Sequence, residues 1–275
     1  MVFKKLAALV AVLILLATPA VHAAGESGAE IAGAVPYLLT ATSDKNACCV
    51  ECTMGNAVAD AVRKYLNTDI AIVCGGDFKA NLPAGDITWD ELRSAFSEHQ
   101  TLATTVVTIS QLREILEVGV SHIQLNEAER IDVPLSVYDG FPQISGFSFQ
   151  YDVTEPAGRR VYAIYFNDER LALDDDTIQF TLASTEYMME GGYGLPDTDQ
   201  IIPTDLTLAD VMARYLNDGM PEYVRTEKRI RAMGTTEGFL SGSTIGIVVA
   251  IAVVLSLLGR RDKKRRMSYY GYYPR

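Results

Sequence analysis

The sequence DIAIVCGGDFKANLPAGDIT, residues 69–88, decides the fold because it joins a strand to a helix through a glycine-rich loop. Asp69 to Val73 is short and apolar, which predicts a buried strand. Thr88 and Glu91 form a capping box that opens a helix. Glycines let a backbone turn tightly and approach a ligand closely. The loop either holds a nucleotide or only keeps the shape of a loop that does.

Helices and strands flank this loop without a regular strand–helix–strand rhythm, which favours an α+β fold over a doubly wound sheet. The hydrophobic periodicity and the capping signals predict both kinds of element. We expect helices over 56–66, after Ser110 as N-cap and from Thr207 to Leu216, and strands over 35–39, 102–109, 144–153, 160–166 and 177–183.

We expect a signal peptide near the N-terminal end of the sequence and a membrane anchor near the C-terminal end. Residues 1–23 have a basic start, an apolar middle and a small-residue cleavage site, as a signal peptide does. Residues 241–258 are uncharged and largely aliphatic, and the basic tail 259–275 follows them. About 20 apolar residues cross a bilayer and basic flanks stay cytoplasmic, so we expect one transmembrane helix, an extracytoplasmic domain and a cytoplasmic tail. Residues 24–45 form a lead-in strand and linker, and 233–240 a stalk.

The charge of the expected exported part is strongly negative. The chain has 24 basic and 35 acidic residues; the signal holds two basic residues, and the tail seven basic and one acidic. The remainder has 15 basic and 34 acidic residues, a net charge of −19. Such a surface repels nucleic acid, so no nucleic-acid partner is expected.

The four cysteines favour a local disulfide over a metal site. Export permits disulfides, and Cys48, Cys49 and Cys52 lie close together in the sequence, with Cys74 further on. No second cysteine or histidine pair follows at zinc spacing, so no metal site is expected.

Five stretches, in order, resemble the C-terminal domain of the 5'-nucleotidases, the family of ecto-5'-nucleotidase and the bacterial periplasmic enzymes. Glu51 to Ala61 resembles E-[CST]-N-[LM]-G-N-L-I-x-D-A, and the opening loop resembles N-G-G-G-I-R-x-x-[IL]-x-x-G-x-I-T. The others are Ser145 to Asp152, Glu190 to Gly194 and Arg229-Ile230. The resemblance covers about residues 35–232.

The resemblance implies a four-layer α/β/β/α domain that binds the base and ribose of a nucleotide, while a separate two-metal domain hydrolyses it. A two-metal phosphatase needs several His, Asp and Asn ligands. This chain has three histidines; His22 leaves with the signal peptide, and His99 and His122 stand in no metal-binding context. We therefore expect no catalytic residues, no cofactor and no activity alone. The resemblance also implies a Cys48–Cys52 disulfide.

The residues at the family's binding positions are altered. Cys74 stands for Asn, Asp77 for the third Gly, Lys79 for Arg, Glu98 and Tyr187 for the two stacking Phe, and Tyr193 for Asp. Asp77 and Glu98 are therefore acidic residues at positions where the family binds an anionic ligand, so AMP affinity should fall. Tyr187 and Tyr193 either cradle a ring or pack together. The retained Gly75, Gly76, Gly191, Gly192 and Gly194 are interpreted as turn glycines that need positive φ.

Three functions stay open from the sequence. The first is a membrane-anchored, non-catalytic module that binds a nucleoside-like or nucleotide-like ligand or a protein partner. The second is the substrate-binding half of a nucleotide hydrolase, completed by a separate metallophosphatase chain. The third is a structural or adhesive surface protein with a relic pocket.

Overall fold

The computed structural model describes residues 29–42, 46–98, 101–221 and 228–235, and the compact unit begins at Ile31. The predicted signal peptide, transmembrane helix and basic tail, together with His99, lie outside these residues. Within the described ranges, no helix is both long and apolar enough to cross a membrane.

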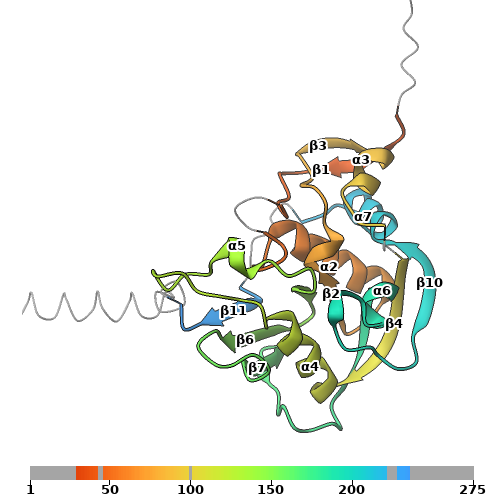
Figure 1. The fold of residues 1–275 in the computed structure, drawn as a ribbon. Helices are drawn as coiled ribbons and strands as arrows, with labels where there is room; N and C mark the ends of the chain where they lie inside the picture. The colour runs from red at the N-terminus through yellow and green to blue at the C-terminus, as the bar shows by residue number, and fades with distance from the viewer. Residues whose placement is uncertain (1–28, 43–45, 99–100, 222–227, 236–275) are drawn as a thin grey trace, which may run out of the picture. The chain divides into compact units, whose positions relative to one another are not determined.

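A five-stranded mixed sheet forms the centre of the unit (Figure 1). β2 runs parallel to β9, and the other neighbouring strands are antiparallel. The order across the sheet is β10 (Ile202–Thr207), β4 (Thr101–Thr108), β9 (Gln179–Thr185), β2 (Ile70–Cys74) and β5 (Pro142–Ser145).

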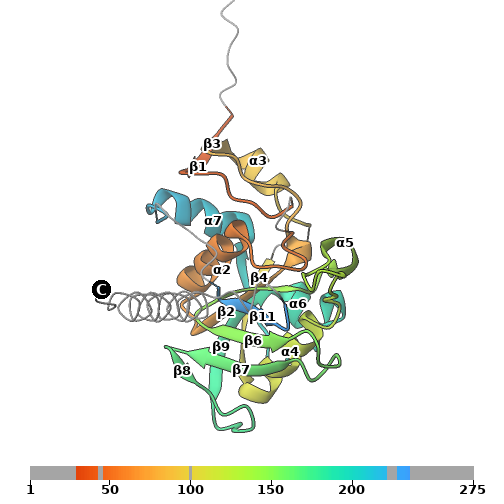
Figure 2. The ribbon, with the colours of Figure 1, turned by 90° about the vertical axis from the view of Figure 1, so that its left-hand side faces the viewer.

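A second, four-stranded sheet is built from later parts of the chain and is seen in the lower half of Figure 2. Its order is β11 (Ile230–Met233), β6 (Ser148–Asp152), β7 (Val161–Phe166) and β8 (Glu169–Arg170). β1 (Ile31–Val35) and β3 (Gly85–Thr88) form a separate antiparallel pair.

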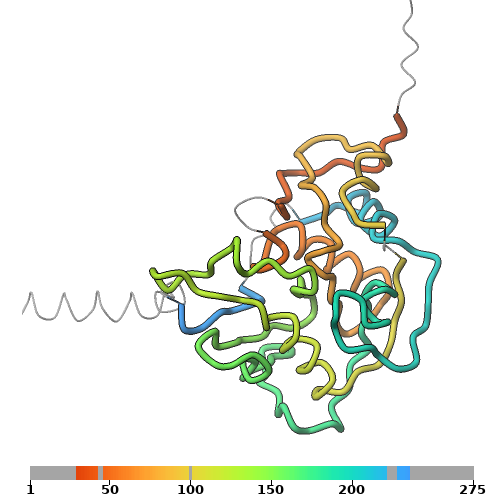
Figure 3. Tube along the Cα trace, viewed as in Figure 1, coloured from red at the N-terminus to blue at the C-terminus, as the bar shows by residue number. Residues whose placement is uncertain are grey.

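The helices pack against these sheets. They are α2 (Thr53–Leu66), α3 (Trp89–Ser94), α4 (Ile109–Gly119), α5 (Val133–Ser136), α6 (Glu186–Met189) and α7 (Leu208–Asn217). α2 and α7 are far apart in the sequence but lie side by side, as Figure 3 shows in orange and light blue. Both helices bury an apolar face, as their helical periodicity predicts.

The five-stranded sheet separates two hydrophobic cores. Side chains alternate across a strand, so β2 contributes Ala71 and Val73 to one core and Ile70 and Ile72 to the other. The first core includes α2 and α7, and the second includes α4 and the four-stranded sheet. The predicted α+β class is confirmed in its coarser part, since helices and strands form one mixed fold that is rich in sheet.

Three sequence predictions differ from the structure. The lead-in strand is Ile31–Val35 rather than 35–39, because its partner β3 pairs at that register. The N-cap of α4 is Thr108, whose hydroxyl accepts from the Gln111 N–H, and not Ser110. The predicted strand 144–153 is two strands, because Gly146 turns the chain at φ +88°.

Candidate functional site

The backbone N–H groups at the start of the loop after β2 donate hydrogen bonds within the protein. Gly75–Asp77 form one 3₁₀ turn. The Gly75 N–H donates to the Phe141 carbonyl at 2.8 Å, and the Gly76 N–H donates to the Asp139 carbonyl at 2.8 Å. The Cys74 N–H is held by the Asp77 carboxylate at 3.0 Å. Because a phosphate cradle needs such N–H groups to point at the ligand, this turn is not built as one.

Asp77 points into the protein rather than into a pocket. It is fully buried, and its carboxylate accepts hydrogen bonds from the Tyr193 hydroxyl at 2.8 Å, the Cys74 N–H at 3.0 Å and the Ser97 hydroxyl at 3.4 Å. Burial raises the pKa of Asp77 to about 7, although these hydrogen bonds oppose the shift. In the structure, groups of the protein itself hold the Asp77 carboxylate, which is not exposed at the loop surface.

Tyr193 reaches across from another loop to meet this carboxylate. Its backbone is left-handed at φ +57°, and its carbonyl accepts from the Tyr138 hydroxyl at 2.6 Å. Burial, followed by the charge of Asp77, raises the pKa of Tyr193. Asp77 and Tyr193 both replace residues of the family motif, and the structure joins the two replacements in one hydrogen bond.

Tyr187 packs against Tyr193. The two ring centroids are 4.9 Å apart and the ring planes meet at 88°, an edge-to-face contact. Two rings that sandwich a base lie roughly parallel with a gap between them. The alternative in which the tyrosines pack together is therefore the one that the structure adopts.

The retained glycines serve two different needs. Gly191 and Gly194 have φ of +85° and +72°, as turn glycines do. At Gly76 a Cβ atom would lie 2.7 Å from Asp139 Cβ and 2.8 Å from Tyr193 Cε1, and at Gly75 it would lie 2.4 Å from the Ala47 carbonyl oxygen. Gly192 is crowded in the same way by the Tyr187 carbonyl oxygen, at 2.4 Å. Positive φ thus explains only some of these glycines, and close approach explains the others.

The two remaining charged candidates lie at the surface. Lys79 and Glu98 are both exposed, and each is close in the sequence to one partner of the buried Phe78–Phe96 contact. The Lys79 N–H donates to the Ala95 carbonyl at 2.8 Å, which fixes its backbone but not its ammonium group. These two side chains are accessible to a ligand or a partner, whereas Cys74 and Asp77 are buried.

All four cysteines are free thiols in the structure, so the implied Cys48–Cys52 disulfide is not formed. The Cys48 thiol donates to Asp139 Oδ1 at 3.6 Å, and burial together with Asp139 raises its pKa to about 12. The Cys52 sulfur caps α2 by accepting from the Gly55 N–H at 3.2 Å. The two sulfurs thus have separate structural partners.

The structure adds a neighbour that sequence reasoning missed. The ring of Tyr138 stacks on His122 with centroids 4.2 Å apart, and its hydroxyl holds the Tyr193 carbonyl. In the sequence, Tyr138-Asp139-Gly140 signals only a turn. Hydrogen bonds to distant residues connect this turn to the site: the Tyr138 hydroxyl donates to the Tyr193 carbonyl, and the Gly76 N–H donates to the Asp139 carbonyl.

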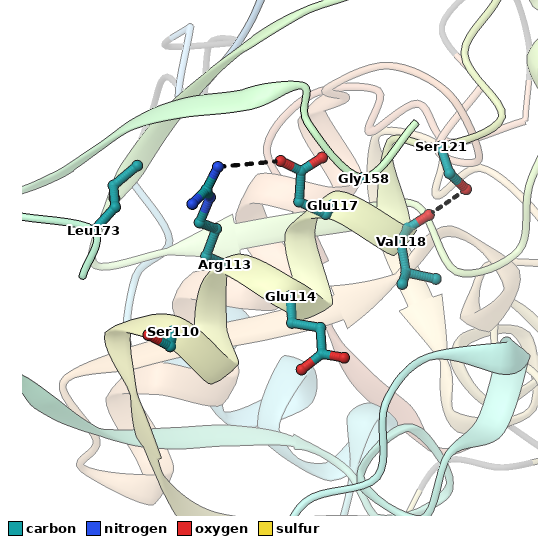
Figure 4. Close-up of a pocket in the computed structure, with 8 residues that line it drawn as sticks. All are labelled: Ser110, Arg113, Glu114, Glu117, Val118, Ser121, Gly158 and Leu173. Carbon is teal, nitrogen blue, oxygen red and sulfur yellow. Dashed lines mark hydrogen bonds and ion pairs between the residues drawn. The ribbon is translucent and has the colours of Figure 1, made fainter. Parts of the chain in front are cut away.

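A hollow of about 460 Å³ lies along α4, away from the loop (Figure 4). Three of its polar side chains, Arg113, Glu117 and Ser121, contact other groups of the protein. Arg113 points toward Glu117, and the Ser121 hydroxyl donates to the Val118 carbonyl. The Glu117 carboxylate accepts from the N–H groups of Arg160 and Val161 at 2.9 Å each. None of the candidate residues lines this hollow.

The described ranges hold no group of three or more His, Cys, Asp or Glu side chains that could bind a metal ion. The arrangement at the loop therefore offers hydrogen-bonding and aromatic groups, and no nucleophile activated by a neighbouring base is formed by the candidate residues.

Comparison with known sequences finds one protein family and relatives that are much longer. A model of the 5'-nucleotidase C-terminal domain matches residues 30–200. The trifunctional nucleotide phosphoesterase protein YfkN of Bacillus subtilis is 27% identical over 152 residues, which is 52% of this chain and 10% of YfkN. The endonuclease YhcR of the same organism is 28% identical over 99 residues, 36% of this chain and 7% of YhcR.

Solved structures share the fold. The 5'-nucleotidase precursor from Thermus thermophilus superposes with a TM-score of 0.62 at 21% identity, covering 84% of this chain and 43% of that one. The NAD nucleotidase NadN of Haemophilus influenzae gives 0.58 at 17% identity, covering 74% and 38%. The chain thus spans less than half the length of both proteins.

Proposed function

The chain belongs to the 5'-nucleotidase C-terminal domain family, and from that premise we propose that it is a non-catalytic ligand-binding module whose nucleotide pocket is closed from within. The observation that carries the proposal is the buried hydrogen bond between Tyr193 and Asp77, with Tyr187 packed edge-on against it. In this proposal the exposed Lys79 and Glu98 remain the groups that meet a ligand or partner.

A nucleotide base that stacks between Tyr187 and Tyr193 needs the two rings to move apart. Opening a slot between Tyr187 and Tyr193 separates Tyr193 from the Asp77 carboxylate and leaves a buried acceptor with one donor fewer. A hydrogen bond to a charged group is worth about 1.5–3 kcal/mol. That energy is lost from binding, so AMP affinity falls by roughly ten- to a hundredfold relative to a pocket that is already open.

The test restores the family residues at both positions. In the full chain, Asp77→Gly with Tyr193→Asp should bind AMP at least tenfold more tightly than the wild type by calorimetry, because the pocket no longer has to open. Asp tolerates the left-handed backbone of position 193. Tyr65→Phe is the matched control, since it removes a tyrosine–aspartate hydrogen bond to Asp218 at the far end of α2. Equal AMP affinity in wild type and double variant would contradict the proposal.

A second candidate is the substrate-binding half of a nucleotide hydrolase that a separate metallophosphatase chain completes. The observation that favours it is that this chain matches only 43% of the Thermus 5'-nucleotidase, which therefore has a further part without a counterpart in the match. The full chain alone should not release phosphate from AMP with added Mn²⁺ or Zn²⁺, whereas addition of a metallophosphatase chain should give activity that Lys79→Ala weakens. Hydrolysis by the isolated chain would overturn the non-catalytic proposal.

We also propose that the domain is held outside the cytoplasm by residues 241–258. The proposal rests on the apolar run and the basic residues that follow it. Trypsin added to intact cells should remove the domain and leave the tail 259–275 protected. A domain protected until the cells are lysed would contradict this topology.

A further inference from the structure

A polar hollow of about 390 Å³ lies away from the candidate loop. Its walls come from α2, the turn between β5 and β6, the β7–β8 hairpin and the residues that lead into β11. None of the candidate residues Cys74, Asp77, Lys79, Glu98, Tyr187 and Tyr193 lines it. The hollow is therefore a separate feature of the fold, and its chemistry does not depend on the proposed function.

The buried part of the hollow contains the ion pair of Arg229 and Asp60, whose opposite charges neutralise each other. Arg229 binds the Asp60 carboxylate through two nitrogens, at 2.8 and 2.9 Å. The Ser145 hydroxyl also donates to Asp60 at 2.5 Å, and Arg63 Nε donates to Ser145 at 2.8 Å. Both Asp60 and Arg229 are largely buried, so neither charge is offered to a ligand.

The rim of the hollow carries positive charge that the described residues leave unpaired. The terminal nitrogens of Arg63, Lys228 and Arg231 have no hydrogen-bond or ion-pair partner within the described ranges. Arg231 Nε donates to the Lys228 carbonyl at 3.0 Å, which holds its guanidinium in place. The remaining acidic side chain of the lining is Asp168.

This charge is opposite in sign to that of the chain, whose net charge is −11. Three cations that line one hollow repel one another, and an anion between them relieves that repulsion. A guanidinium offers paired donors that match the oxygens of a phosphate. The lining also includes the polar side chains of Ser148, Tyr165 and Asn167.

We propose that this hollow binds a phosphate monoester, with the phosphate between Arg63, Lys228 and Arg231 and the polar alcohol part toward Tyr165 and Asn167. The volume is within the range of small-molecule sites, about 300–1,000 Å³, and exceeds what one inorganic phosphate needs. A free phosphorylated alcohol and the headgroup of an anionic lipid present the same chemistry.

The experiment titrates the full chain with glycerol 3-phosphate by calorimetry at low salt. Arg63→Gln and Arg231→Gln should each weaken binding about tenfold, because each removes one charged contact. Raising the salt should weaken binding further. Arg130→Gln is the matched control, since Arg130 is exposed and lies outside this lining, and it should leave affinity unchanged.

Sedimentation with vesicles of phosphatidic acid, with phosphatidylcholine vesicles as reference, identifies the source of the phosphate. Binding of free glycerol 3-phosphate that depends on Arg63 and Arg231 assigns the site to a soluble ligand. Vesicle binding with the same dependence, without binding of the free compound, assigns it to a lipid headgroup. The proposal is overturned if neither probe binds, or if Arg130→Gln weakens binding as much as Arg63→Gln does. Unchanged thermal melting of the variants shows that they fold.

Discussion

Asp77 is a buried acid that hydrogen-bonds one loop of the candidate site to another. Its carboxylate is fully buried and accepts from the Tyr193 hydroxyl, the Cys74 N–H and the Ser97 hydroxyl. The family motif has glycine at this position, where no side chain could reach Tyr193. In the proposed function, the Asp77 side chain bonds the loop to Tyr193 and so keeps the nucleotide pocket closed.

Because burial raises the pKa of Asp77 to about 7, the stability of the protein should depend on pH through this residue. The ordinary pKa of the group is 3.8, so between about pH 4 and pH 7 the native state binds more protons than the unfolded state. The contribution is fully present below the unfolded pKa and is lost as the pH rises through the folded pKa.

We expect the free energy of unfolding of the wild type to fall by a few kcal/mol from pH 4 to pH 7 relative to that of Asp77→Asn, measured by urea unfolding. Asn presents one acceptor oxygen where the carboxyl group of Asp77 presents two, so the substitution changes the baseline stability, but Asn does not titrate. The informative quantity is therefore the difference in slope. Parallel pH profiles for the two proteins would show that Asp77 does not carry a raised pKa.

At the scale of elements, the start of α7 is set by a local motif. The Thr207 hydroxyl accepts from the Asp210 N–H at 3.2 Å, and the Asp210 carboxylate accepts from the Thr207 N–H at 3.0 Å. Thr207→Ala removes this cap and should lower the free energy of unfolding by about 1 kcal/mol in urea unfolding. Thr207→Ser keeps the hydroxyl and should lose much less. Equal losses would mean that the threonine methyl, rather than the cap, stabilises α7.

Motifs whose partners are close in the sequence could be predicted, and contacts between distant residues could not. The capping boxes at Thr88 and Thr207 were predictable because their partners lie three residues away, and both are present in the structure. The Asp77–Tyr193 bond spans 116 positions, and a motif match aligns backbones without giving side-chain directions. β10 was missed because its pairing to β4 depends on a strand about a hundred residues earlier.

At the scale of the whole molecule, the end of the domain is tied back to its beginning. β11 pairs in parallel with β6 at the edge of the four-stranded sheet. Arg229, just before β11, binds Asp60 on α2, and the Ile230 N–H donates to Glu51 at 3.3 Å. The ion pair thus joins elements from two sides of the central sheet.

Breaking this tie should cost far more than breaking a surface pair. The side chains of Arg229 and Asp60 are 13% and 22% exposed, so Arg229→Gln leaves a largely buried carboxylate without its partner and should destabilise the protein by about 2–4 kcal/mol. In a double-mutant cycle with Asp60→Asn, the coupling energy should exceed about 1 kcal/mol, because the second substitution removes the orphaned charge.

Lys64 and Asp218 provide the matched control, since their nitrogen–oxygen distance is 3.0 Å but their side chains are 48% and 54% exposed. Solvent screening weakens such a pair, so its coupling energy in the same urea assay should be clearly smaller than that of the Asp60–Arg229 pair. Equal coupling in the two cycles would mean that burial does not strengthen the Asp60–Arg229 pair. In that case the hydrogen bonds of β11 to β6, rather than this ion pair, would hold the end of the domain in place.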